Sequence, residues 1–358
     1  MPSLKEIKGR INSISSTLAI TSAMKMVAAA KLQKAQMAIQ NMLPYERRLH
    51  SMLIDLMGAM NISAAASEDG SVRGSGSAER GFDQSGDRLS LSNRHDLAGM
   101  DGAYSLMAQR EVRKVAIVAF ASNSSLCGAF NSNVIREATA VINEYRASGL
   151  GDADITVYSV GRKMAGAMKK LGFPSPADFT KMSDSPSYDA ASALAQELFD
   201  GFVSGRFDKV ELVYNHYKST SSQPTTRQTY LPLSLADATA DLQAGKITDS
   251  ASESDTNRGA EPVGAPVVRQ GSPTTEDLIV EPSKEELIAT LLPKVVRLRV
   301  FTTLLDSTAA EQAARTVAMQ LATDNGNDLL QELTLEYNKG RQQKITSEIL
   351  DLVGGSMQ

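Results

Sequence analysis

The sequence contains few of the residues that build disulfides and metal sites. Among 358 residues there are one cysteine and three histidines, and tryptophan is absent. A single cysteine cannot form an internal disulfide, which fits a reducing compartment. The histidines, His50, His95 and His216, are far apart in the chain, and no two of them have the spacing of metal ligands. We therefore expect no disulfide framework and no metal site.

The sequence also lacks the patterns of nucleic-acid binding and of membrane insertion. Lysine and arginine number 37 against 41 acidic residues, so there is no surplus of positive charge to neutralise phosphates. No run approaches the roughly 18 apolar residues of a membrane-spanning helix. The opening residues, MPSLKEIKGRINSI, have no apolar signal-peptide core, and we expect a chain that is mature as written. Membrane contact, if any, is then made by partners.

Signs of catalysis are equally scarce. There is no glycine-rich phosphate loop ending in Gly-Lys-Ser/Thr. Gly161, Arg162 and Lys163 open a helix after an expected strand, which weakly suggests an anion site, although a plain turn is the favoured interpretation. Cys127 in SSLCGAFN also follows a strand, where a nucleophile could lie. Without a nucleophile elbow or a neighbouring histidine, a small buried apolar residue is favoured, and we expect no catalytic residue and no cofactor.

Long amphipathic helices are predicted at both ends of the chain. From Leu4 the apolar residues recur every three or four positions, and the pattern continues through a kink at Pro44 to about residue 60. About 55 residues would make a rod of roughly 80 Å. A second period follows a capping box at Ser283, with a kink at Pro293 and a weak point at Gly326. Such helices can bury their apolar stripes against each other, which predicts an antiparallel coiled coil.

The middle of the chain alternates between strand and helix patterns. Buried strands are expected at 112–120, 154–160, 209–217 and 226–235, with helices at 130–147, 162–171 and 188–204. This order predicts a central Rossmann-like α/β domain with a mostly parallel sheet. The segments 62–109 and 236–275 are rich in Ser, Gly, Asp and Ala, and we interpret both as mobile insertions. The expected division is a coiled-coil helix at 1–61, an insertion at 62–109, the α/β domain at 110–235, an insertion at 236–282 and a coiled-coil helix at 283–358.

One surface of the first helix combines basic and flexible apolar side chains. Its members are Met24, Lys25, Met26, Lys31, Lys34 and Met37. Two interpretations fit this pattern equally well. One is an ordinary coiled-coil surface with methionine in the seam, and the other is a contact surface that repacks against changing neighbours. The residue types alone leave both interpretations open.

Three motifs carry a resemblance to a known family. The segments AMKMVAAAK, ARTVAMQLATDN and YNKGRQQKIT closely resemble the gamma subunit of F-type ATP synthases, over both terminal helices and more loosely over the central domain. The resemblance implies a non-catalytic rotor shaft, present once per complex, inside a ring of alternating alpha and catalytic beta subunits. It also implies contact with an epsilon subunit and a membrane c-ring. Because the opening residues do not resemble a transit peptide, we expect a bacterial protein at the cytoplasmic face of the inner membrane, with a processed organellar chain as the alternative.

The resemblance further implies which residues contact partners. Met24, Lys25 and Arg315 are similar to shaft residues that face the mobile lever of a beta subunit. Arg341 and Gln342 are similar to the pair that contacts the beta-subunit catch loop. The planar guanidinium of arginine suits this role because it can pair with loop carboxylates in contacts that form and break.

Contacts at the foot depart from the family pattern. Glu281 resembles the acidic residue that meets polar loops of the membrane ring, but Leu278 and Val280 stand where some relatives have tyrosines. The two insertions are a second departure, and we hypothesise that they form an appendage on the foot that touches the epsilon subunit or restrains rotation.

Two other classes of function compete with the rotor. A free-standing α/β enzyme with helical arms predicts a pocket at the carboxyl ends of the strands. A generic coiled-coil scaffold predicts no need for an ATPase partner. The missing phosphate loop disfavours the enzyme, and the three motifs disfavour the scaffold.

Overall fold

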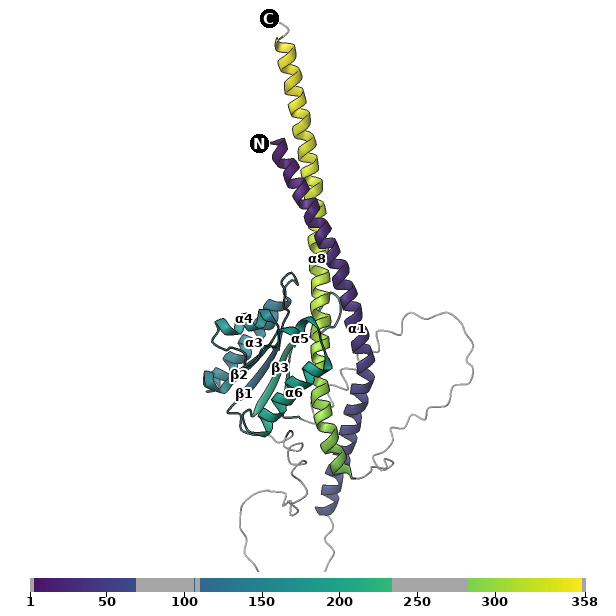
Figure 1. Ribbon diagram of the computed structural model, residues 1–358, viewed down its shortest axis with the longest axis vertical. Coiled ribbons are helices and arrows are strands. Elements are labelled where there is room, and N and C mark those ends of the chain that lie inside the picture. The colour runs from purple at the N-terminus through teal and green to yellow at the C-terminus, as the bar shows by residue number, and fades with distance from the viewer. Residues whose placement is uncertain (1–2, 69–105, 107–109, 234–282, 356–358) are drawn as a thin grey trace, which may run out of the picture.

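Two parts make up the molecule, a long helical shaft and an α/β domain beside it (Figure 1). The computed structural model describes residues 3–68, 106, 110–233 and 283–355. Glu281 and most of the two expected insertions lie outside the described residues. Within the described part, none of the helices combines the length and the apolarity that crossing a membrane requires.

The shaft consists of the two terminal helices, α1 (Leu4–Glu68) and α8 (Lys284–Gly355). Both ends of the chain lie toward the same end of the shaft, so the helices are antiparallel (Figure 1). The Oγ1 atoms of Thr21 and Thr323 are 3.1 Å apart, and the hydroxyl of Thr302 donates to Glu46 at 3.1 Å. These contacts place the start of α1 beside the later half of α8, and the predicted coiled coil is confirmed.

Two details of the helices differ from the expectations. Helix α1 continues to Glu68, beyond the expected end at residue 61, because the Ala-rich segment ISAAASE favours helix despite its low content of large apolar residues. Gly326 is a point of close packing rather than a weak point: a Cβ atom there would lie 2.8 Å from Cδ2 of Leu18 on α1. Both Pro44 and Pro293 lie inside continuous helices.

The α/β domain contains a four-stranded sheet in the order β2-β1-β3-β4. Its strands are β1 (Val115–Phe120), β2 (Ile155–Val160), β3 (Lys209–Asn215) and β4 (Thr225–Leu231). Strand β1 is parallel to β2 and β3, and β4 is antiparallel to β3. The predicted α/β class with a mostly parallel sheet is confirmed.

Helices cover both faces of this sheet. They are α3 (Phe130–Ala147), α4 (Arg162–Lys170), a short α5 (Thr180–Asp184) that the sequence did not suggest, and α6 (Tyr188–Val203), with a 3-10 turn η1 (Asp152–Asp154) before β2. Residues of α3 and α4 form one core with alternate residues of β1, including Ile117. On the opposite face α6 and α8 share a core with Val118 and Phe120. Helix α8 is therefore part of the shaft and also a covering helix of the domain.

Candidate functional site: the junction of shaft and domain

The carboxyl ends of β1 and β3 meet at the edge where doubly wound domains usually bind ligands. The chain leaves β1 toward β2 on one side and returns to β3 on the other, which creates a topological switch point between β1 and β3. In this chain α8 passes over that position: Cys127 and Phe130, which follow β1, pack against Ala310 of α8. The place where an α/β enzyme would hold its substrate is filled by the shaft.

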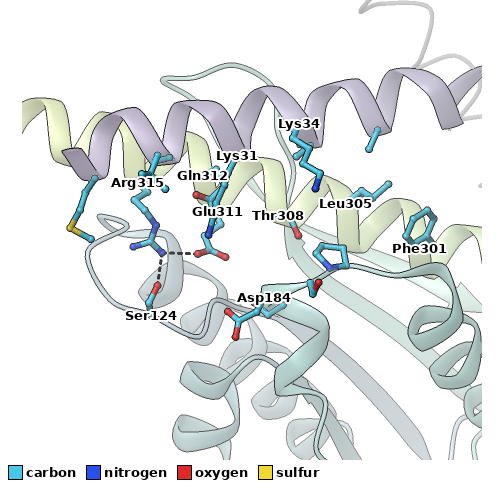
Figure 2. Close-up of a pocket in the computed structure, with 18 of the residues that line it drawn as sticks. Lys31, Lys34, Ser124, Asp184, Phe301, Leu305, Thr308, Glu311, Gln312 and Arg315 are labelled. Atoms are coloured by element: carbon cyan, nitrogen blue, oxygen red, sulfur yellow. Dashed lines mark hydrogen bonds and ion pairs between the residues drawn. The ribbon is translucent and has the colours of Figure 1, made fainter. Parts of the chain in front are cut away.

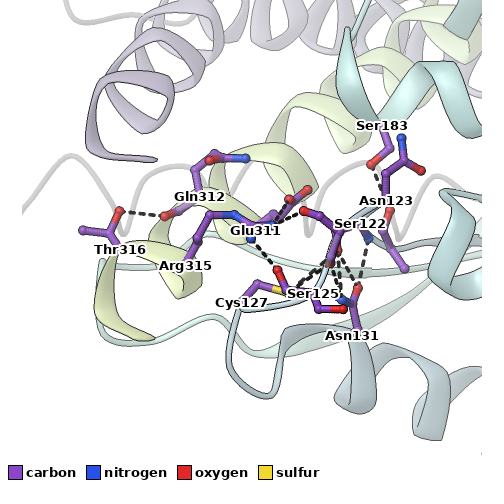
Figure 3. A network of polar contacts seen from close by, with 12 residues as sticks. Ser122, Asn123, Ser125, Cys127, Asn131, Ser183, Glu311, Gln312, Arg315 and Thr316 are labelled. Carbon is purple, nitrogen blue, oxygen red and sulfur yellow. Dashed lines mark hydrogen bonds and ion pairs between the residues drawn. The ribbon is translucent and has the colours of Figure 1, made fainter. Parts of the chain in front are cut away.

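Arg315 of α8 is the centre of a polar network at this edge (Figure 3). Its guanidinium donates to the carbonyl of Ser125 at 2.6 Å, to the hydroxyl of Ser124 at 2.8 Å and to the Glu311 carboxylate at 2.6 Å. Both charged side chains are only 9% exposed. Burial raises the pKa of the Glu311 carboxyl above its ordinary value, and the bond from Arg315 opposes that rise. Arg315 therefore ties the loop after β1 to the shaft.

The same loop is held from the other side by Asn131 of α3 (Figure 3). The side chain of Asn131 accepts from the amide of Ser122 at 3.0 Å and donates to the carbonyl of Ser124 at 3.2 Å. Leu126, in the middle of the loop, has a φ of 69°, a conformation that costs a leucine roughly 1 to 3 kcal/mol and persists only where the surroundings enforce it. The loop is thus rigidly placed between α3 and α8.

The two weak chemical signals of the sequence are explained by packing. Cys127 is 1% exposed and its sulfur accepts a hydrogen bond from Asn131 at 3.1 Å, which agrees with a small buried residue rather than a nucleophile. At the start of α4 the amide of Arg162 donates to Oδ1 of Asn123 at 2.8 Å and the amide of Lys163 to a carbonyl at 3.2 Å. Gly161 has a φ of 98° and fits a tight turn. These amides are bound within the protein and do not form a phosphate site.

A cavity of about 600 Å³ lies between α1, α8 and the residues around α5 (Figure 2). Its charged lining residues are Lys31, Lys34, Asp184, Glu311 and Arg315. Basic and acidic groups are nearly balanced, and apolar side chains of both shaft helices complete the wall. We interpret the cavity as a crevice at the junction, without the concentrated charge of a nucleotide site.

The structure places the predicted contact residues in different environments. Met24 lines the junction cavity, and both Met24 and Lys25 are half-buried on α1. Arg341 and Gln342 are exposed on α8. They follow Gly340, which lies against the beginning of α1: a Cβ atom at Gly340 would be 3.1 Å from the side chain of Leu4. Arg341 and Gln342 therefore lie where α8 extends beyond its partner helix.

Arg315 has contacts within the chain that the resemblance did not indicate. Its guanidinium is bound by residues of its own chain, and the expected contact with a beta subunit stays a prediction. Sequence reasoning also missed Glu311, four residues earlier on the same helix, although an i, i+4 acidic and basic pair was visible.

Comparison with known proteins identifies the family. A family model described as ATP synthase matches residues 3–357. The chain is 46% identical over 357 residues to the ATP synthase gamma chain of Phocaeicola vulgatus and 45% identical over 358 residues to that of Bacteroides thetaiotaomicron, with 100% of each chain covered in both cases. A solved chain from the Euglena gracilis mitochondrial ATP synthase (OSCP/F1/c-ring) has the same fold, with a TM-score of 0.52, 19% identity and coverage of 99% of this chain and 93% of that one. The chain belongs to the gamma chain family of ATP synthases.

Proposed function

We propose that the chain is the central-stalk rotor of an ATP synthase. It couples ion-driven rotation of a membrane c-ring to conformational changes of the catalytic beta subunits, and it is itself non-catalytic. The observation that carries this proposal is the double role of α8, which belongs to the shaft and to the core of the α/β domain. A torque applied to the domain therefore acts directly on the shaft.

The free end of the shaft suits contact with a surrounding ring. Beyond Gly340, α8 continues past the beginning of α1 (Figure 1). Large apolar side chains are exposed there, with Leu350 at 65% and Leu352 at 75%. Exposed apolar side chains gathered at one site are typical of interaction surfaces. The occupants we propose are the alpha and beta subunits, and each beta conformation is favoured in turn by differential contact with the asymmetric shaft.

Specific partner contacts follow from this placement. We propose that Arg341 and Gln342 bind a beta-subunit loop, and that Met24 and Lys25 face a beta subunit near the junction. Glu281, by its resemblance alone, would contact the c-ring. Arg315 is part of the same proposed contact as Met24 and Lys25, and it also positions the loop after β1.

The proposed location is peripheral, at the cytoplasmic face of a bacterial inner membrane, with one copy in each complex. The two relatives named above are bacterial gamma chains, which supports this placement. The epsilon subunit and the c-ring would connect the chain to the membrane.

Reconstitution tests the rotor function. Purified alpha and beta subunits would be combined with and without the chain, and ATPase turnover and rotation of a bead on the α/β domain would be recorded. We expect turnover that depends on the chain, and stepwise rotation. Arg341→Ala with Gln342→Ala should slow turnover, whereas Arg136→Ala, an exposed arginine on α3, should not. A chain that leaves turnover of the alpha and beta subunits unchanged would refute the rotor proposal.

A further inference from the structure

A second polar contact joins the domain to the shaft at the end of β3. His216 and Tyr217 directly follow this strand, and both are bound by one carboxylate of α8. Oδ2 of Asp306 lies 2.6 Å from Nδ1 of His216, and Oδ1 accepts from the amide of Tyr217 at 2.8 Å. Two consecutive residues of the domain are thus fixed by the two oxygens of a single side chain.

Tyr217 extends the contact to the other shaft helix. Its hydroxyl accepts a hydrogen bond from Nε2 of Gln36 on α1 at 2.7 Å. Its ring packs against a small apolar cluster at the seam of α1 and α8, which contains Leu32 and Ala309. One short segment of the domain therefore contacts both shaft helices at the same level.

Resting on the proposed rotor function, we propose that Asp306, His216, Tyr217 and Gln36 form a torsional latch that makes the α/β domain and both shaft helices turn as one body. Asp306 is the positioning residue of the latch, because it holds the segment from which Tyr217 reaches α1. The assignment goes beyond the partner contacts above, since it concerns how torque passes between parts of this chain.

Torque shears the domain against the shaft at this place. The apolar core that α8 shares with the domain resists this shear, and directional contacts add to that resistance. Hydrogen bonds to a charged group are stronger and depend on geometry, so they resist such displacement. The Arg315 network anchors the loop after β1 to α8, and the latch anchors the segment after β3 to α8 and α1. Together they hold the domain at the ends of two neighbouring strands.

The test measures the stiffness of the latch in the complex of alpha and beta subunits with the full-length chain. A bead is attached through Lys169→Cys, which lies on the exposed surface of α4, while the native Cys127 is only 1% exposed. Angular fluctuations of the bead are recorded while the catalytic ring is paused. In Tyr217→Phe, which removes the hydroxyl, and in Asp306→Asn, which removes the charge, we expect the angular variance to rise above the wild-type value. The rise should be larger in Asp306→Asn, because Asp306 makes two of the three latch bonds.

Controls separate the latch from general destabilisation. Asp152→Asn makes the same chemical change in an exposed ion pair of the domain and should leave the variance at the wild-type value. His216→Asn keeps an amide donor near the Nδ1 position and should stay closer to wild type than His216→Ala. A role in folding alone would lower the unfolding temperature without changing the variance of the assembled complex.

The outcomes distinguish this inference from the rotor function itself. If the wild-type complex rotates and both Tyr217→Phe and Asp306→Asn show wild-type variance, the latch is refuted and the rotor function stands. If the wild-type chain neither rotates nor stimulates ATPase activity, the rotor function fails first. Should Asp306→Asn fail to assemble, Tyr217→Phe decides the question, since it deletes only the hydroxyl that accepts from Gln36 and keeps the half-buried ring.

Discussion

Arg315 offers the strongest single test of how the shaft is fixed to the domain. We consider Arg315→Met, which keeps a long side chain but removes the charge and the donors. The change deletes three hydrogen bonds and leaves the carboxylate of Glu311 buried without its cation. Breaking one side of a buried ion pair costs about 3 to 5 kcal/mol. Since burial already raises the pKa of Glu311, proton uptake can relieve part of this penalty, and we expect a loss of about 3 kcal/mol at neutral pH.

The pH dependence of the stability loss provides a second, independent test of this prediction. A carboxyl whose pKa in the folded protein is raised above its unfolded value of 4.5 holds extra protons in the fold, so stability falls as pH rises above that value. The destabilisation by Arg315→Met should therefore be smaller at pH 5 than at pH 8. Urea unfolding of the full chain, followed by circular dichroism at both pH values, measures the difference as a shift in midpoint at constant slope.

Two control variants define what would refute the reasoning. Replacing both partners, Arg315→Met with Glu311→Leu, should recover most of the lost stability because no charge remains buried. Arg10→Met removes one side of an exposed ion pair with Glu6 and should cost less than about 1 kcal/mol. If Arg315→Met is no more costly than Arg10→Met, or if the double replacement recovers nothing, the buried pair does not fix the shaft to the domain as we argue.

Three further predictions concern the latch, the sheet and the coiled coil. The hydrogen bond to Asp306 raises the pKa of His216, although burial and the nearby Lys218 oppose the rise. The stabilisation of the fold by protonated His216 is therefore present below about pH 6.5 and is lost as pH rises through the folded pKa. The urea midpoint should fall over that range in wild type, but less in His216→Asn. Burial alone would raise the pKa of Glu211, but hydrogen bonds from basic and tyrosine side chains outweigh burial and lower the pKa. The stabilisation of the fold by ionised Glu211 is therefore present above pH 4.5 and is lost as pH falls. In Glu211→Gln the free energy of unfolding should change less at acidic pH than it does in wild type. Gly326→Leu should lower stability by about 1 to 3 kcal/mol through overpacking, and a thermal melt of the double variant with Leu18→Ala should show partial recovery.

The sequence predicts the architecture well because its signals are long and repeated. A three-to-four period sustained over more than fifty residues has few structural solutions other than a paired helix. The run VAIVAF is apolar at every position, and all six residues of β1 are buried between two helical layers, as expected for a central parallel strand. These features depend on local pattern and on burial, both of which are visible in one chain.

Features of the junction are poorly predicted from the sequence because they depend on tertiary contacts between segments that are far apart in the chain. The position of Arg315 on α8 was clear, but its orientation toward Ser124 and Ser125 depends on the loop after β1, 190 residues earlier in the sequence. Gly326 looked like a helix breaker by its intrinsic propensity, whereas its role is to admit Leu18 of α1. Tertiary contact overrides propensity at such positions. The predicted contacts of Met24, Lys25, Arg315, Arg341 and Gln342 with other subunits stay predictions.

The position of α8 explains how a fold that usually binds ligands can serve a mechanical role. At the switch point between β1 and β3, a nucleotide-binding domain leaves a cleft lined by free amides. Here the polar groups of the loop after β1 form hydrogen bonds within the protein, and the segment after β3 is held by Asp306. A helix that fills this cleft contacts the ends of two rigid strands instead of a flexible surface. Because the strands are fixed in turn by the sheet, rotation of the domain about the shaft would have to break both connections together with the core that α8 shares with the sheet.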